Sequence, residues 1–441
     1  ARAALAAGFA GVSLDRPDAS LAQGLLGAGF CAECQREFTR RLGREYGEQF
    51  QPIDYLRLAR EAVASAPGAV GYGALPFGRD FWRFRHDMLE RSVRAHARAA
   101  RDAARAAGRP FAVGAWFEAV GPAQLAAARH LDAAVFPAGP PDGPGPGLSS
   151  LLRATMGRRA AAVAPPPDAP AAQLLRLAAL GAPWGVGLAG TPPGGDAALQ
   201  LGRLRALVQK LAEEGRAPGT AQPVFECALL YSADADLWSG GRHRRALALA
   251  AEALAAHHVQ APVVTRLADA PAGAVVVLAD ADGLAPHEAT ELGRRLDGGA
   301  GVLAFGKPAG VRAVGGALVQ LPALAPERGG EAALDGALLD KALVALLGKG
   351  RRAVGVTGRA RVGATLWRQG DAVDVHLVTL GAERAQGNTL FVGLHVAGGH
   401  RRARFRAADG ASVEIRLNPS LSSVSTILPA FSGYAVLSLG G

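Results

Sequence analysis

Two carboxylates follow directly after short apolar segments that have the character of strands in a parallel sheet. Asp15 closes the segment 9–14 and Glu118 follows the segment 111–117. Uninterrupted apolar runs are typical of strands covered on both faces, and Pro17 cannot continue a strand ladder. Because the carboxyl ends of parallel strands share one edge, we expect both carboxylates there, placed for nucleophilic or acid–base chemistry. The alternative for Asp15 is a cap on the following turn.

Five such strand segments alternate with helical ones over the first half of the chain. The strands are expected at 9–14, 111–117, 132–136, 160–164 and 184–188, and a long helix at 79–107 ends at a glycine. This alternation predicts right-handed βαβ units and a parallel sheet. A (β/α)8 barrel needs eight strands, so a barrel reading implies that its first three strands lie upstream of a truncated start. An open doubly wound sheet is the alternative, because it needs no closure.

The rest of the chain changes character twice. Residues 223–355 read as a second α/β region with a buried strand at 274–279, and residues 360–441 as short strands separated by Gly, Asn and Asp. The latter spacing predicts a small antiparallel β-sandwich. We therefore expect three domains, at 1–217, 218–357 and 358–441.

The stretch after the first strand carries a recognisable motif. Cys31 and Cys34 form a C-x-x-C that leads into a helix with Phe38 and several arginines. A strand ending in Asp followed by this motif resembles the hypothetical glycosyl hydrolase 6 group, which is related to the α-L-fucosidases. Over roughly the first 140 residues, the resemblance implies a (β/α)8 barrel with Asp15 as its nucleophile. An aromatic residue is usual before that Asp, whereas this chain has Leu14.

A second resemblance concerns the next domain. The segment 228–232, followed by Trp238, is similar to the opening of the amidotransferase-like, or trimerisation, domain of family 42 β-galactosidases, where this domain follows the barrel. No cysteine nucleophile elbow is present, and Cys227 reads as a core residue. Since the strands at 160–164 and 184–188 end without the Glu that serves that family as nucleophile, the resemblance covers domain order and not the site.

Together these observations predict a retaining glycoside hydrolase. Such an enzyme needs two carboxyl groups about 5–5.5 Å apart, and we assign Asp15 as nucleophile and Glu118 as acid/base. Substrate contacts are expected from a cation beside Asp15 and from aromatic side chains that could stack on sugar rings or simply pack in the core. These candidates are Arg16, Trp116, Trp184 and Tyr72.

Other carboxylates compete less well for a catalytic role. Asp132 begins its strand, at the wrong end of a barrel, and Glu226 lies within a strand of the second domain and reads as structural. Asp234 and Asp236 are expected in a loop, where a binding role is open.

The cysteines do not predict a disulfide scaffold, because there are only three. Cys31 and Cys34 have the spacing of half a zinc site, but no second pair or nearby histidine completes it. With Phe38 and Leu42 they fall at helical spacing, so we interpret them as apolar residues of one helix face.

Net charge and composition bear on which binding partners the sequence predicts. The net charge is +10, and all but four of the 48 basic residues are arginine, spread over Ala-rich segments. We attribute this to a GC-rich genome rather than to nucleic-acid binding. We expect no membrane span, no nucleotide or metal cofactor, and a carbohydrate substrate; a dimer or trimer and a cytoplasmic location stay open.

The alternatives to an enzyme are a non-catalytic carbohydrate-binding or assembly protein on a glycosidase scaffold, and an inactive fragment of an enzyme. The identity of the sugar does not follow from the sequence.

Overall fold

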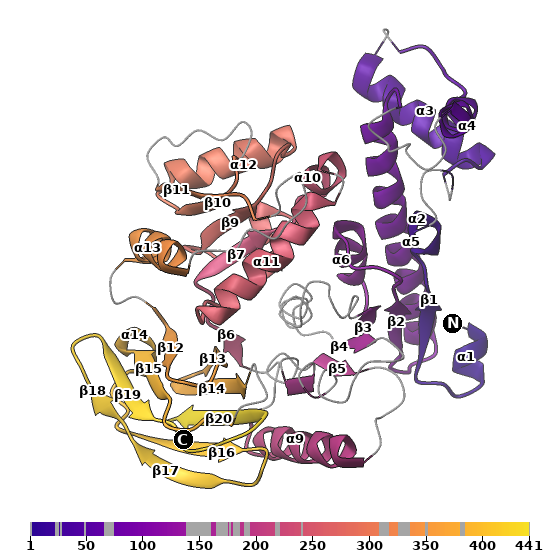
Figure 1. The fold of residues 1–441 in the computed structure, drawn as a ribbon. Coiled ribbons are helices and arrows are strands. Elements are labelled where there is room, and N and C mark those ends of the chain that lie inside the picture. Colours follow the sequence, from indigo (N-terminus) through magenta and orange to yellow (C-terminus); the bar gives the residue numbers. More distant parts are fainter. Residues whose placement is uncertain are drawn as a thin grey trace. The chain divides into compact units, whose positions relative to one another are not determined.

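The computed structural model divides the chain into two compact units, Ala1–Pro137 and Ala138–Gly441, which we describe separately (Figure 1). It describes residues 2–22, 26, 29–47, 50–65, 75–137, 160–164, 175, 178–179, 186–188, 195–216, 221–239, 241–307, 317–324, 336–348, 352–379 and 384–440. In these segments, no helix combines the length and apolar character needed to cross a membrane. The three-domain division stays a prediction.

The first unit contains three parallel strands in the order β1-β2-β3, which confirms the parallel pairing predicted for them. Its elements are α1 (Arg2–Ala6), β1 (Gly11–Asp15), α2 (Ala19–Ala22), α3 (Ala32–Tyr46), α4 (Tyr55–Ser65), α5 (Gly78–Ala106), β2 (Ala112–Trp116), α6 (Pro122–Ala128) and β3 (Ala133–Pro137). Asp15 is thus the last residue of β1, and Glu118 lies two residues beyond β2.

The long helix α5 directly precedes β2 in the chain and packs beside it (Figure 1). Buried residues recur along it every three or four positions, among them Phe81, Leu89, Val93 and Ala97, so one largely apolar face, which also contains Arg85, is buried along its whole length. Gly108 has a φ of +64° just beyond the last turn, as predicted for a glycine that ends a helix.

An aromatic cluster joins α3 and α4 to the start of α5. The ring of Phe81 lies 4.6 Å from Tyr55 and 5.1 Å from Phe38 between centroids. Leu42 completes the apolar face of α3 and is fully buried. The sequence predicts a helix over about 32–46, which matches α3, but it gives no indication of α4.

In the second unit, β4 and β5 form a parallel pair and five later strands form a parallel sheet in the order β11-β10-β9-β7-β8. The elements here are β4 (Ala160–Ala164), β5 (Val186–Leu188), α9 (Gly195–Glu213), β6 (Gln222–Pro223), β7 (Cys227–Leu230), α10 (Ala233–Trp238), α11 (Arg242–Ala256), β8 (Val263–Val264), η4 (Leu267–Asp269), β9 (Val275–Ala279), α12 (Pro286–Asp297), β10 (Val302–Phe305), β11 (Leu318–Leu321) and α13 (Gly336–Leu347). Every residue of β9 is buried, as its apolar run predicts. Closure of strands β1 to β5 into a barrel stays a prediction.

The C-terminal part of this unit consists of two antiparallel sheets, with strand orders β12-β15-β19-β18 and β17-β16-β20-β14-β13-β6. The strands are β12 (Val354–Thr357), β13 (Val362–Gln369), β14 (Ala372–Thr379), β15 (Thr389–Gly393), β16 (Arg402–Ala407), β17 (Ser412–Arg416), β18 (Asn418–Pro419), β19 (Ser423–Ile427) and β20 (Tyr434–Leu439), with helix α14 (Leu394–Ala397) after β15. Inward side chains of both sheets, such as Leu390 and Leu437, share one core. The sequence predicts a strand over residues 390–395, and this prediction is wrong at its end, since the chain turns into α14 after Gly393.

Candidate active site

The candidate site lies at the carboxyl ends of β1 and β2. Asp15 is paired in register with Trp116 on the neighbouring strand, and laterally paired residues of a sheet direct their side chains to the same face. The Asp15 side chain is 81% exposed and Trp116 is 39% exposed. A carboxylate and an indole therefore stand side by side on one accessible strand edge.

Arg16 brings the two predicted catalytic carboxylates together. Its Nη1 donates a hydrogen bond of 3.0 Å to Oε1 of Glu118, and its Nε lies 3.7 Å from Oδ1 of Asp15. The Glu118 side chain is 26% exposed, so it is the more enclosed of the two. One guanidinium thus links groups 103 positions apart, which the sequence predicts only as neighbours on one edge.

The backbone at Arg16 is held in an unusual conformation. Its φ is 42°, in the left-handed region that residues other than glycine rarely adopt. Its N–H donates a hydrogen bond of 2.8 Å to the carbonyl oxygen of Trp116. The chain therefore turns at the end of β1 while remaining tied to β2, and the turn directs the guanidinium between the carboxylates.

A third carboxylate, Asp18, positions Glu118 by binding the backbone of the loop after β2. Asp18 is fully buried and accepts hydrogen bonds from the N–H groups of Glu118 and Ala119, at 3.0 and 3.3 Å. It also accepts a bond of 2.9 Å from Nε2 of Gln124, the side chain of which is buried in α6. A Cβ at Gly121 would lie 2.6 Å from Oε1 of Gln124, so the small residue there leaves room for this arrangement.

Sequence reasoning missed Asp18 because an aspartate shortly after a strand usually serves a local turn. Here its partners lie about 100 residues away in the sequence. The available signal was a second aspartate three residues after Asp15, and this spacing alone does not separate a turn from a long-range anchor.

The other residues that the sequence analysis considered for the site are Trp184, Tyr72 and Asp132. Trp184 and Tyr72 lie outside the described residues, so their proximity to the carboxylates stays a prediction. Asp132 has structural partners. Its Oδ2 accepts the N–H of Val113 at 2.9 Å, and its Oδ1 accepts a hydrogen bond from Arg101, also at 2.9 Å. Asp132 thus fixes the start of β3 against β2.

The carboxylates of the second unit have structural partners. Glu226 accepts the N–H of Ala353 at 2.9 Å, and burial raises the pKa of this carboxyl. Asp234 and Asp236 belong to helix α10, so the expectation of a loop there is wrong. Ser232 explains the difference, because its hydroxyl caps α10 by accepting the N–H of Ala235.

Within the described segments, no group of three or more His, Cys, Asp or Glu side chains is arranged to hold a metal ion. The chemistry that the site can perform with its own residues is that of two carboxylates and a cation. A carboxylate can attack or exchange a proton, and an arginine can bind hydroxyl or carboxylate oxygens.

Comparison with known proteins identifies the class of fold. No protein-family model and no curated protein matches the sequence. Solved structures of glycoside hydrolases match 82–93% of the chain, so this chain has a fold of the glycoside hydrolase type.

The particular neighbours include three sugar-cleaving enzymes. A catalytic mutant of Gan42B, a GH42 β-galactosidase from G. stearothermophilus, aligns with a TM-score of 0.57 and 11% identity over 93% of this chain and 76% of that one. The α-L-fucosidase isoenzyme 2 from Paenibacillus thiaminolyticus gives 0.53 and 12% over 91% and 74%. The rhamnosidase from Novosphingobium sp. PP1Y gives 0.50 and 14% over 82% of this chain and 40% of that one, so this chain spans about two fifths of the rhamnosidase. At these identities the likeness concerns the fold alone.

Proposed function

We propose that this chain is a glycoside hydrolase that cleaves a small sugar or oligosaccharide with retention, using Asp15 as nucleophile and Glu118 as acid/base. The observation that carries the proposal is the bridge from Arg16 to both carboxylates at the ends of adjacent parallel strands. The neighbouring folds support the same class, because they belong to a β-galactosidase, a fucosidase and a rhamnosidase.

The proposed arrangement of the chain follows these neighbours. Strands β1 to β5 form part of a (β/α)8 barrel, and residues 1–217 are a partial barrel domain. An amidotransferase-like domain at 218–357 and a β-sandwich at 358–441 follow it. The parallel sheet around β9 and the two antiparallel sheets support this order.

In the proposed mechanism, Asp15 attacks the anomeric carbon while Glu118 protonates the departing oxygen. A covalent glycosyl–Asp15 ester results, and Glu118 then takes a proton from the water that hydrolyses it. Arg16 has to leave Oε1 of Glu118 before the glycosidic oxygen can reach it, and a freed guanidinium can bind a substrate hydroxyl instead. Trp116, on the same face as Asp15, provides a flat surface for a sugar ring.

The direct test is hydrolysis of 4-nitrophenyl glycosides of fucose, galactose and rhamnose. We expect turnover of at least one, its loss in Asp15→Asn, and a fall of about 10²–10⁴-fold in kcat for Glu118→Gln. Asp102→Asn is a matched control, since Asp102 is a half-exposed carboxylate of α5 that pairs only with helix arginines in the described structure. Unchanged turnover in Asp15→Asn would remove this residue from the mechanism.

A second candidate is a non-catalytic carbohydrate-binding protein on the same scaffold. The high exposure of Asp15 favours it, because a nucleophile generally works in a site that excludes water. Sugar binding measured by calorimetry without turnover of any glycoside would support this candidate, whereas turnover that depends on Asp15 and Glu118 would rule it out.

A further inference from the structure

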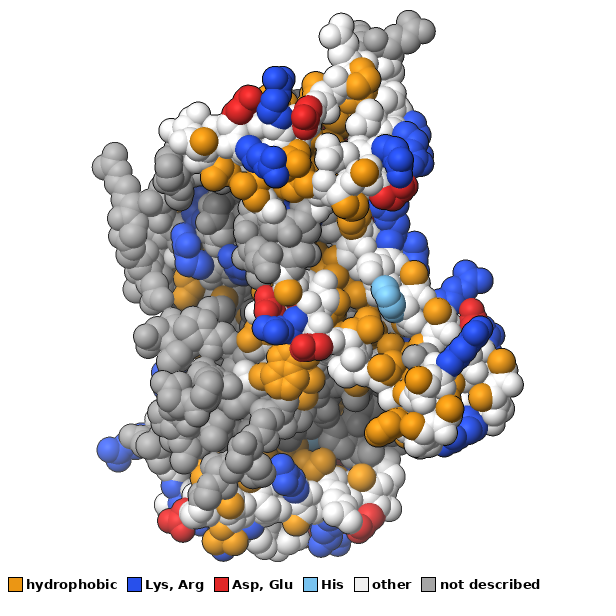
Figure 2. Space-filling view, turned by 90° about the vertical axis from the view of Figure 1, so that its right-hand side faces the viewer, with side chains coloured by type: hydrophobic (Ala, Val, Ile, Leu, Met, Phe, Trp, Pro, Cys, Tyr) orange, Lys and Arg blue, Asp and Glu red, His pale blue; other side chains and the backbone are white. Residues whose placement is uncertain are grey.

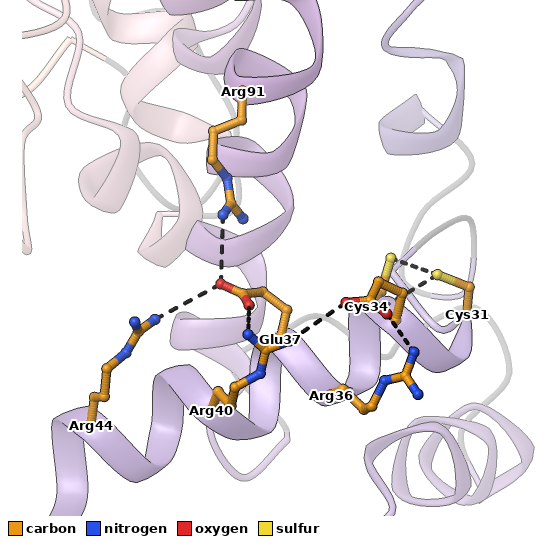
Figure 3. A network of polar contacts seen from close by, with 8 residues as sticks. Cys31, Cys34, Arg36, Glu37, Arg40, Arg44 and Arg91 are labelled. Carbon is orange, nitrogen blue, oxygen red and sulfur yellow. Dashed lines mark hydrogen bonds and ion pairs between the residues drawn. The ribbon is translucent and has the colours of Figure 1, made fainter. Parts of the chain in front are cut away.

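Cys31 and Cys34 of the first unit form a close pair at the start of a helix. Cys31 is the N-cap of α3 and Cys34 lies in its first turn. Their Sγ atoms are 2.8 Å apart, and Sγ of Cys31 also accepts the backbone N–H of Cys34 at 3.3 Å. Figure 3 shows both sulfurs side by side at the helix end. The sequence-based interpretation of Cys31 as an apolar helix-face residue is therefore wrong, because it is exposed and acts as a cap.

The two thiols differ in environment. Cys31 is exposed, and the hydrogen bonds from the side chain and backbone of Cys34 lower its pKa. Cys34 is partly buried, and burial, followed by the interaction with Cys31, raises its pKa to about 11. The positive end of the helix dipole further favours a thiolate at the cap position. Cys31 is thus suited to attack and Cys34 to remain protonated until a partner sulfur is near.

Nearby acidic groups are already paired with arginines, as Figure 3 shows for this face of α3. Glu33 binds Arg36 and lies 3.5 Å from Arg40. Glu37 lies within 4 Å of three arginines. These pairs reduce the repulsion that free carboxylates would exert on a thiolate at the helix end.

We propose that Cys31 and Cys34 are a redox-active dithiol that exchanges with disulfides of low-molecular-weight thiols of the glutathione type. The Cys31 thiolate attacks one sulfur of the small disulfide, forms a mixed disulfide and releases one thiolate, which takes up a proton. Cys34 then loses its proton to solvent, attacks Sγ of Cys31 and expels the second thiolate. The dithiol is oxidised by two electrons to a Cys31–Cys34 disulfide, and the small disulfide is reduced to two thiols.

The geometry permits this step with little movement. A disulfide has an S–S distance of about 2.05 Å, so the sulfurs need to approach by under about 1 Å, which side-chain rotation can provide. This spacing, with an exposed first cysteine and a shielded second one at a helix N-terminus, is the arrangement that promotes thiol–disulfide exchange. The activity is independent of the proposed sugar chemistry.

The experiment is a redox titration of the folded protein in defined ratios of reduced to oxidised glutathione, followed by alkylation and mass analysis of each cysteine. We expect a Cys31–Cys34 disulfide that forms reversibly. The reduced Cys31 should be alkylated at pH 7 at least about tenfold faster than Cys34. Cys227 is an internal control, since it is fully buried and should stay unmodified while the protein is folded.

Two serine variants separate the roles. Cys34→Ser should accumulate the mixed disulfide of Cys31 with glutathione, because the resolving thiol is gone. Cys31→Ser should form none, and serine is a good N-cap residue, so this variant is expected to keep the start of α3. Circular dichroism before each titration verifies folding.

Two outcomes would overturn the proposal. One is alkylation of Cys31 and Cys34 at equal rates with no internal disulfide at any glutathione ratio. The other is purified protein that carries stoichiometric zinc and has both thiols protected from alkylation until a chelator is added, which would make the pair part of a metal site.

Discussion

Asp18 is the residue on which the position of Glu118 depends most directly. It is fully buried, and its oxygens are the acceptors for two backbone N–H groups and one side-chain amide. A buried acceptor of this kind contributes mainly through the donors that lose their partner when it is removed. The loop after β2 is therefore held by a carboxylate that takes no part in the proposed chemistry.

Replacing Asp18 should therefore destabilise the fold. We expect Asp18→Ala to lower the free energy of unfolding by about 3 kcal/mol, because one buried and two half-buried donors lose their acceptor. Urea unfolding followed by circular dichroism measures this. Asp102→Ala, on the exposed face of α5, should stay within about 0.5 kcal/mol of the wild type. Equal effects of the two substitutions would contradict the anchoring role of Asp18.

The sequence predicted part of this site and could not predict the rest. Asp15, Arg16 and Glu118 were identified because strand ends can be read from apolar runs. The role of Asp18 depends on a loop that approaches from about 100 residues away, and no local pattern encodes such an approach. The bridging position of Arg16 depends likewise on its left-handed backbone, which residue type does not predict, since arginine rarely adopts it.

At the level of the elements, the aromatic cluster holds α3 and α4 against α5. Phe81 is at its centre, 1% exposed and close to the rings of Phe38 and Tyr55. Phe84 adds a second aromatic contact between α3 and α5, with its ring centroid 5.3 Å from that of Phe38.

We expect Phe81→Ala to lower the free energy of unfolding by about 3–5 kcal/mol, since it removes a large buried ring and leaves a cavity. Phe9→Ala provides the same substitution at a site that is 63% exposed, and it should have little effect. Chemical denaturation, with near-ultraviolet circular dichroism to follow the aromatic packing, measures both. A small loss in Phe81→Ala would show that the helices are held by other contacts.

Elements with their own periodic pattern were predictable. The helical spacing of Phe38 and Leu42 predicts α3, and the apolar run at 274–279 predicts β9. Helix α10 was missed because it is short and begins at a capping serine that also fits a turn. The sequence does not predict strand β19, because its Ser-rich sequence acquires strand structure by pairing with β15. Tertiary pairing decides such segments, not local preference.

At the scale of the whole molecule, several histidines are buried in uncharged form. Burial lowers the pKa of His86 to about 3, and of His258 and His376 to about 4. Where Figure 2 colours the side chains, Lys and Arg lie at several places among apolar and acidic side chains. We therefore expect the loss of folding stability at low pH to arise from these three histidines.

The sign of the pH dependence follows from these shifts. The unfolded chain takes up protons near pH 6.5, whereas the folded histidines do so only near pH 3 to 4, so stability falls as the pH drops through this interval. We expect His376→Gln to reduce the stability difference between pH 7 and pH 5 by about 2 kcal/mol, even if the variant is less stable at both. Urea unfolding at the two pH values tests this. His96→Gln, at an exposed position of α5, should leave the difference unchanged.

The left-handed turn at Arg16 has a consequence for engineering. A non-glycine residue in that conformation carries a cost of order 1–3 kcal/mol, which glycine would avoid. A selection of variants for thermal stability is therefore expected to enrich Arg16→Gly. The same replacement would remove the cation that lies between Asp15 and Glu118. At this residue, a change that raises thermal stability is therefore expected to lower the proposed activity.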